Sequence, residues 1–158
     1  MMGSRKRLPL AAAAVITATL LSACEPERGV RATRDFDRKV DVACVERALN
    51  DSFPHVSRYD YVDDGYGTFT KGTQVAQFTY YRSDDRRGVS WVEVGDTKQG
   101  ARLSHSFTGL GMELPQEDFP EALSKMRQAN AALAAQCQLE LGTAKLKEIG
   151  QDVDALND

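Results

Sequence analysis

Apolar positions recur every three or four residues between residues 35 and 52, which is the period of an α-helix with one apolar face. Thr33 or Asp35 is the candidate N-cap, since both side chains can accept hydrogen bonds from the first turn. Pro54 ends the pattern, because the residue before a proline avoids helical geometry. The sequence therefore predicts a helix over 35–52.

A second stretch of helical period runs from residue 116 to residue 141. Pro120 suits its first turn and Gly142 suits its end. A further short helix is expected over 144–149.

Between the two helices the pattern changes to runs of β-branched and aromatic residues broken by turn-forming clusters. We expect four strands, over 57–63, 74–83, 88–95 and 100–108. Short connections favour antiparallel pairing in sequence order, a meander. The predicted fold is α+β, a two-layer α-β-β-β-β-α domain with the N- and C-terminal helices packed on one face of the sheet.

Such a sheet leaves its second face free of helices, and alternation along the strands assigns side chains to that face. The candidate binding face consists of Gln77, Thr79, Tyr81, Trp91 and Arg102. Aromatic side chains rimmed by polar ones are typical of protein-binding surfaces. The alternative is that Trp91 packs beneath a loop or a helix.

The first 23 residues differ in character from the rest of the chain. A basic start, Arg5-Lys6-Arg7, precedes fourteen uncharged residues over 8–21, and small residues follow. Together these are the three parts of a secretory signal peptide. The apolar run is shorter than the about 20 residues that a membrane-crossing helix needs. A buried N-terminal helix and an uncleaved membrane anchor are the alternatives.

The four residues Leu21-Ser22-Ala23-Cys24 resemble the lipobox of bacterial lipoproteins. The resemblance implies that the Cys24 thiol takes a diacylglycerol as a thioether, that the chain is cut before Cys24, and that the new amine is often acylated. It implies a membrane-anchored protein of the cell envelope whose covalent lipid is its only expected cofactor. Glu25, in place of an Asp, favours the outer membrane over the inner membrane.

The charge of the processed chain argues against nucleic acid as a partner. Removing residues 1–23 lowers the number of Lys and Arg residues from 20 to 17 and leaves 23 Asp and Glu residues, a net charge of −6. Affinity for nucleic acid comes largely from basic residues on phosphates. The local basic cluster of Arg82, Arg86 and Arg87 remains available to a protein partner.

If Cys24 carries lipid, Cys44 and Cys137 are left as a pair. The space outside the cytoplasmic membrane is oxidising, so an even pair there predicts a disulfide. Both cysteines lie on the apolar faces of the predicted helices, so the bond would join these helices. Two free buried thiols are the alternative. A metal site is not expected, because His55 and His105 are not spaced as ligands with the cysteines.

Few residues suggest catalysis. His105 is a candidate general base, but its neighbours Leu103 and Phe107 favour a place in the core. The acidic pairs Asp63-Asp64 and Asp84-Asp85 favour turns over a calcium loop.

The sequence thus divides into a cleaved signal peptide (1–23), a tether (24–34), a globular domain (35–142) and a C-terminal helix or tail (143–158). We expect a non-catalytic domain that binds a protein of the envelope, as an inhibitor, an immunity protein or an assembly factor. The alternative is a periplasmic enzyme that uses His105.

Overall fold

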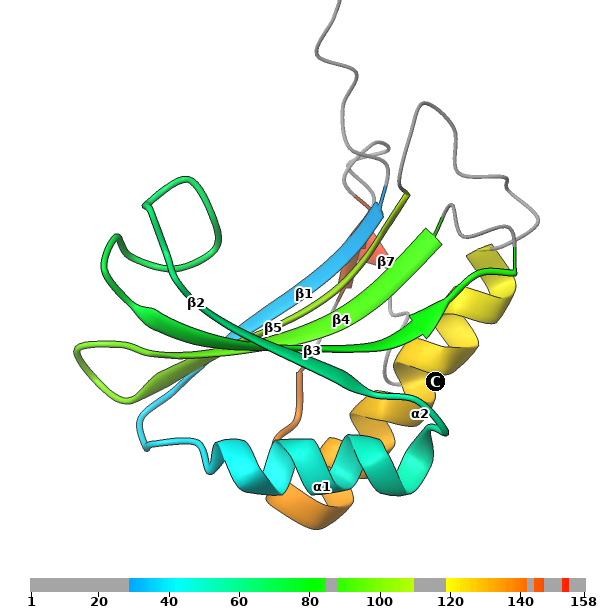
Figure 1. Cartoon of the computed structure of the whole chain (residues 1–158), viewed down its shortest axis with the longest axis horizontal. Coiled ribbons are helices and arrows are strands. Elements are labelled where there is room, and N and C mark those ends of the chain that lie inside the picture. The colour runs from blue at the N-terminus through cyan, green and yellow to red at the C-terminus, as the bar shows by residue number, and fades with distance from the viewer. Residues whose placement is uncertain (1–28, 85–87, 110–118, 142–143, 147–151, 154–158) are drawn as a thin grey trace, which may run out of the picture.

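A computed structural model describes residues 29–84, 88–109, 119–141, 144–146 and 152–153. They form an α+β fold in which two helices pack on one face of an antiparallel sheet (Figure 1). The strands lie in the order β2-β3-β4-β5-β1-β6-β7. The elements are β1 (Gly29–Phe36), α1 (Val42–Ser52), β2 (Ser57–Val62), β3 (Gln74–Arg82), β4 (Gly88–Asp96), β5 (Ala101–Gly109), α2 (Phe119–Cys137), β6 (Ala144–Leu146) and β7 (Asp152–Val153).

The predicted meander is confirmed. Strands β2 to β5 lie within one or two residues of the expected ranges and pair antiparallel in sequence order. Alternation along these strands places Phe78, Val92 and Leu103 in the core beneath the helices. Neither described helix is long and apolar enough to cross a lipid bilayer.

The predicted tether over 24–34 is wrong from Gly29 onwards, because residues 29–36 form β1. This strand pairs with β5 along its whole length, from Gly29 opposite Thr108 to Phe36 opposite Ala101. Val30 and Ala32 point into the core and are buried. The core side of the strand carries Val30, Ala32 and the half-buried Phe36 but is interrupted by Arg34, too weak a pattern to mark the strand without its partner. The folded part therefore begins no later than Gly29, not at residue 35.

Helix α1 begins at Val42 instead of residue 35. Thr33 and Asp35, the predicted N-caps, both lie in β1. The N-cap is Asp41, whose side chain accepts a hydrogen bond from the Ala43 amide at 3.0 Å. The helix ends before Phe53, its C-cap, so the stop predicted from Pro54 is confirmed.

Helix α2 ends at Cys137, earlier than expected. Gln138 takes the left-handed conformation (φ 57°), and its amide donates to the Ala134 carbonyl at 3.1 Å, as in an αL C-cap motif. The Leu139 amide donates to the Leu133 carbonyl at 3.2 Å. The guanidinium of Arg38 caps the exposed end by donating to the Gln138 carbonyl at 2.9 Å. The predicted stop, Gly142, lies outside the described residues.

The helix predicted over 144–149 is wrong in its first part. Residues 144–146 form β6, which pairs with the free side of β1: Val30 lies opposite Leu146 and Arg31 opposite Lys145. An unpaired strand edge can recruit a short segment whatever its helical propensity. Residues 147–149 lie outside the described residues.

A disulfide joins Cys44 of α1 to Cys137 at the end of α2, as predicted, with the Cα atoms 5.9 Å apart. The two helices pack against each other and share one core with the sheet. The bond therefore links an early and a late part of the chain on the same side of the sheet.

Candidate functional site

The sheet curves away from the two helices, so its helix-free face is concave (Figure 1). The loop formed by residues 63–73, between β2 and β3, rises at one end of this face. We call this surface the concave face. The strand register places on it Arg31, Thr33, Asp35, Tyr59, Tyr61, Gln77, Thr79, Trp91, Glu93, Arg102, Ser104 and Ser106.

Paired polar groups form the floor of the concave face. The Tyr61 hydroxyl donates to Glu93 Oε1 at 2.9 Å, and Arg31 Nε donates to Ser106 Oγ at 3.1 Å. Glu93, Ser104 and Ser106 are buried, although neither of the two described helices lies on this face. Desolvation raises the pKa of Tyr61, and the hydrogen bond to Glu93 adds to this effect. The tyrosine is thus held as a neutral donor to the carboxylate.

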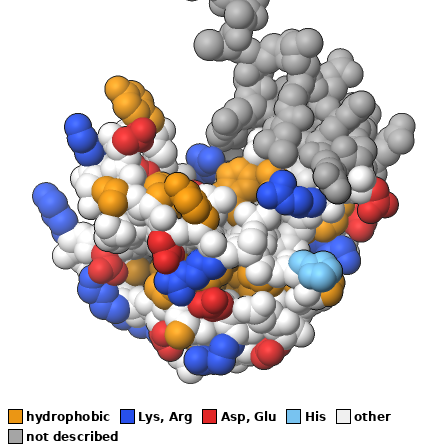
Figure 2. Space-filling model, in the orientation of Figure 1, with side chains coloured by type: hydrophobic (Ala, Val, Ile, Leu, Met, Phe, Trp, Pro, Cys, Tyr) orange, Lys and Arg blue, Asp and Glu red, His pale blue; other side chains and the backbone are white. Residues whose placement is uncertain are grey.

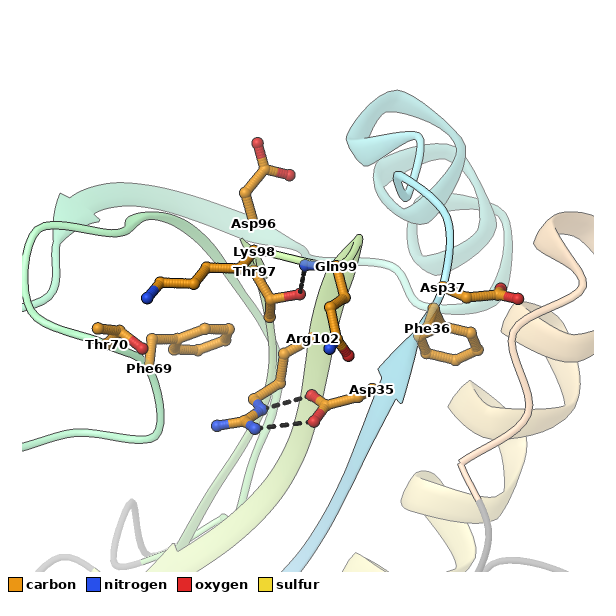
Figure 3. A pocket seen from close by; sticks show the side chains of 10 residues that line it. All are labelled: Asp35, Phe36, Asp37, Phe69, Thr70, Asp96, Thr97, Lys98, Gln99 and Arg102. Atoms are coloured by element: carbon orange, nitrogen blue, oxygen red, sulfur yellow. Dashed lines mark hydrogen bonds and ion pairs between the residues drawn. The ribbon is translucent and has the colours of Figure 1, made fainter.

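Arg102 connects three parts of the chain at one end of the concave face. Its Nε and Nη2 donate to the two carboxylate oxygens of Asp35 on β1, at 2.6 and 2.8 Å (Figure 3). Its Nη1 donates to the Thr68 carbonyl in the loop at 2.8 Å. Hydrogen bonding to Arg102 lowers the pKa of Asp35. This bidentate pair has the geometry of a strong charge-assisted contact.

A cavity of about 350 Å³ opens beside this ion pair. Figure 3 shows Lys98 from the β4–β5 turn extending towards Phe69 and Thr70 of the loop, while Gln99 from the same turn points towards Asp35. The three acidic residues Asp35, Asp37 and Asp96 and the two basic residues Lys98 and Arg102 line it, so both signs of charge are present.

Phe69 anchors the loop to the concave face. Its ring is buried and lies over Gly95, where an added Cβ would meet two ring carbons at 2.7 Å. Gly95 is therefore required at this position of β4, because any side chain would displace the ring.

Exposed tyrosines stand at the β2 end of the concave face. Tyr59 is 65 % exposed and stacks on Tyr61, with ring centroids 5.9 Å apart, and Tyr66 in the loop is 94 % exposed. Figure 2 shows hydrophobic side chains at this end of the molecule interspersed with basic and acidic ones. Aromatic groups of this kind can be buried by a partner at small cost in side-chain entropy.

Four of the five predicted face residues lie on the concave face: Gln77, Thr79, Trp91 and Arg102. Trp91 is only partly exposed, and its buried Nε1 makes no hydrogen bond to any described residue. Arg102 is already engaged with Asp35 and Thr68.

Tyr81 was wrongly assigned to this face. The pairing shifts by one residue between Thr79 and Tyr81, which sets Tyr81 opposite Ser90. A bulge of this kind reverses the sides to which later residues point. Tyr81 consequently packs against the core cluster on the helix side.

Sequence reasoning missed Arg31, Tyr61 and Glu93. Glu93 alternates with Trp91 along β4, and Tyr61 alternates with Tyr59 along β2, so period-two spacing was a usable signal for both. Arg31 gave no such signal, because it lies in the segment for which the sequence predicts a tether.

His105 lies in the core, as the environment of Leu103 and Phe107 suggested. It is fully buried, and its Nε2 shares a hydrogen bond with the Tyr80 hydroxyl. Burial lowers the pKa of His105 to about 3, so the ring is neutral at pH 7. The burial places it out of reach of a substrate bound at the surface.

The side chains of the acidic turn residues accept hydrogen bonds from nearby backbone amides. Asp63 Oδ1 accepts from the Gly65 amide at 2.7 Å, and Asp64 Oδ1 accepts from the Tyr66 amide at 3.0 Å, which is ordinary turn chemistry. In the described part of the chain, no group of three or more potential ligands is placed to hold a metal ion. Cys24, with the rest of the predicted lipobox, lies outside the described residues.

No family model matches the chain. No curated protein and no solved structure matches it either. The class to which the protein belongs is therefore given by its own architecture: an α+β fold with an antiparallel sheet backed by two disulfide-linked helices.

Proposed function

We propose that this protein is a lipid-anchored lipoprotein of the bacterial envelope whose concave face binds another protein without catalysis. The observation that carries the binding role is the exposure of Tyr59 and Tyr66 beside a sheet face whose polar side chains are paired with one another. Aromatic side chains dominate the energetics of protein interfaces, and a rigid polar surround gives them orientation.

The charges on the concave face support a protein partner over nucleic acid. Arg31 and Arg102 are accompanied by Asp35 and Glu93, and both arginines donate to oxygen atoms of the protein itself. A phosphate backbone needs basic groups free to contact it.

The disulfide supports an address outside the cytoplasm. Structural disulfides persist in oxidising compartments and are rare in the cytosol. Together with the signal-like segment and the lipobox-like residues ending at Cys24, it favours export followed by lipidation.

The anchor is tested with the full gene product in a diderm host. We expect the wild type and Ser22→Ala, which keeps a small residue before the cleavage point, to partition with membranes and to begin at a lipidated Cys24 by mass spectrometry. Cys24→Ser should lose the lipid and leave the membrane fraction. A serine variant that stays equally membrane-bound would contradict the anchor.

The binding role is tested by affinity capture of the full chain from detergent-solubilised envelopes. We expect one stoichiometric protein, lost at least tenfold in Gln77→Arg and Tyr66→Ser. Arg47→Ser, an exposed change on α1, serves as the matched control and should retain it. Equal capture by all variants would place the partner elsewhere, and no specific capture by wild type would contradict the binding role. If the captured protein is a hydrolase, loss of its activity on addition of the purified chain would identify an inhibitor.

A further inference from the structure

The outer edge of strand β2 offers a second surface, which adjoins the concave face at Tyr59. It ends the sheet, and the order of strands leaves its outer side without a neighbour among the described residues. Its side chains are almost all exposed. Unpaired edges of this kind tend to pair with another strand unless the sequence opposes it.

The register identifies the backbone groups that β2 presents to solvent. The Asp63 amide donates to the Thr73 carbonyl at 2.8 Å, so this directly opposed pair is a hydrogen-bonded one. Such pairs alternate along an antiparallel ladder. The amides and carbonyls of Ser57, Tyr59 and Tyr61 consequently face β3, while those of Arg58, Asp60 and Val62 face outward.

We propose that β2 pairs antiparallel with β2 of a second copy of this chain, about a two-fold axis at Tyr59. In this register Arg58 of each copy lies opposite Asp60 of the other, and the outward backbone groups of both residues form four hydrogen bonds. The arrangement is self-complementary, as a two-fold interface must be.

Alternative registers are less favourable. Only outward-facing residues can hydrogen-bond each other, so the axis must fall on a residue from Arg58 to Val62. An axis at Val62 opposes Val62 with itself and pairs no other residue of the strand. An axis at Arg58 or at Asp60 opposes identical charges, which destabilises paired strands. An axis at Tyr61 opposes Asp60 with Val62 and gives no opposite-charge pair within the strand.

The side chains are suited to the Tyr59 register. Arg58 uses Nε on Asp60 and Nη1 on Glu46, both at 2.9 Å, and its Nη2 makes no hydrogen bond to a described residue. That nitrogen is available to Asp60 of the second copy. On the opposite face the two Tyr59 rings meet as a non-hydrogen-bonded pair, in which side chains approach most closely. The dimer would join both sheets with their concave faces on the same side.

The first experiment is site-directed disulfide trapping in membranes that carry the full chain. We expect Tyr59→Cys to give a reducible dimer on mild oxidation, at least fivefold above Val62→Cys. Val62 has similar exposure, but its two copies would stand about 20 Å apart in this register. Equal trapping at both positions, stronger trapping at Val62, or none at Tyr59 would overturn the proposal.

The second experiment separates contacts between copies from those within one. In the Tyr59→Cys background, Arg58→Asp and Asp60→Arg should each lower trapping at least fivefold, because each opposes like charges across the axis. Co-expression of differently tagged Arg58→Asp and Asp60→Arg chains should restore a mixed dimer to at least half the parental level, since only the mixed pair opposes unlike charges. Mixed trapping no higher than that of the single variants, with both chains present at parental levels, would overturn the proposal. Neither experiment depends on the partner proposed for the concave face.

Discussion

The Tyr80–His105 pair is a polar contact enclosed by apolar side chains between β3 and β5. Burial also raises the pKa of Tyr80, so both groups stay neutral over the physiological range. A histidine held neutral in the core makes the stability of the fold depend on pH. The unfolded chain binds a proton on this side chain at a pH where the folded chain does not.

The direction of this coupling gives a pH prediction. The folded pKa of about 3 lies below the model value of 6.5, so the unfolded state binds more protons between these two values. The free energy of unfolding should fall as the pH falls from 6.5 towards 3, by up to about 1.4 kcal/mol per pH unit from this residue. His105→Leu should flatten that dependence in urea titrations at pH 7 and pH 4.5.

Tyr80→Phe is the control for the pH experiment. It removes the hydroxyl but keeps the buried ring of His105, so its stability should depend on pH as steeply as that of the wild type. A His105→Leu variant with an unchanged slope would show that other groups cause the acid sensitivity.

Gly95 gives a second prediction at the scale of single residues. Gly95→Val should lower the free energy of unfolding by about 1–3 kcal/mol, because its side chain overlaps the Phe69 ring. In Gly95→Val/Phe69→Ala the valine occupies space that the ring has left, so the double variant should cost less than the sum of the two single changes. Urea unfolding of the four proteins measures this coupling, and strict additivity would show that the two residues do not interact.

At the scale of secondary-structure elements, β1 is the main difference between expectation and structure. Val30→Asp should cost about 3 kcal/mol or more, because it buries a charge opposite Phe107 beneath the helices. Thr33→Asp, on the exposed side of the same strand, should change stability by less than about 1 kcal/mol. Equal, small effects in thermal unfolding would indicate a tether instead of a strand.

The disulfide between α1 and α2 makes the largest predicted contribution of a single bond. It closes a loop of 93 residues, which in the chain-entropy view corresponds to about 4–5 kcal/mol. Cys44→Ser/Cys137→Ser should therefore lower the free energy of unfolding by several kcal/mol in urea titrations. Dithiothreitol should bring the wild type close to the variant and leave the variant unchanged; a wild type insensitive to reduction would contradict the assignment.

Local sequence patterns predicted the strands in which apolar and polar residues alternate strongly. They failed for segments whose conformation is determined by pairing with a neighbouring strand. Strands β3 to β5 carry rows such as Ala76, Phe78 and Tyr80, which mark a sheet by themselves. Residues 29–36 and 144–146 become strands through their neighbours, β5 and β1. Tyr81 was misplaced by one bulge, a local irregularity that period-two reasoning cannot anticipate.

At the scale of the whole molecule, strand β1 contributes to the sheet, to the concave face and to the core. This strand lies between β5 and β6 and donates Arg31 to the concave face, Asp35 to the Arg102 pair and Val30 to the core. The N-terminal segment thus connects the candidate site to the helices. Without β1 the concave face would lack Arg31 and Asp35, the hydrogen-bond partners of Ser106 and Arg102.

The early start of β1 also limits where the domain can stand. With lipid on Cys24, as we propose, only five residue spacings separate the anchor from Gly29. This segment spans about 17 Å when fully extended. The domain would then be confined to a layer close to the bilayer surface. A partner of the domain must lie in that layer or extend a segment into it. Cell-wall components farther from the membrane could therefore not contact the domain.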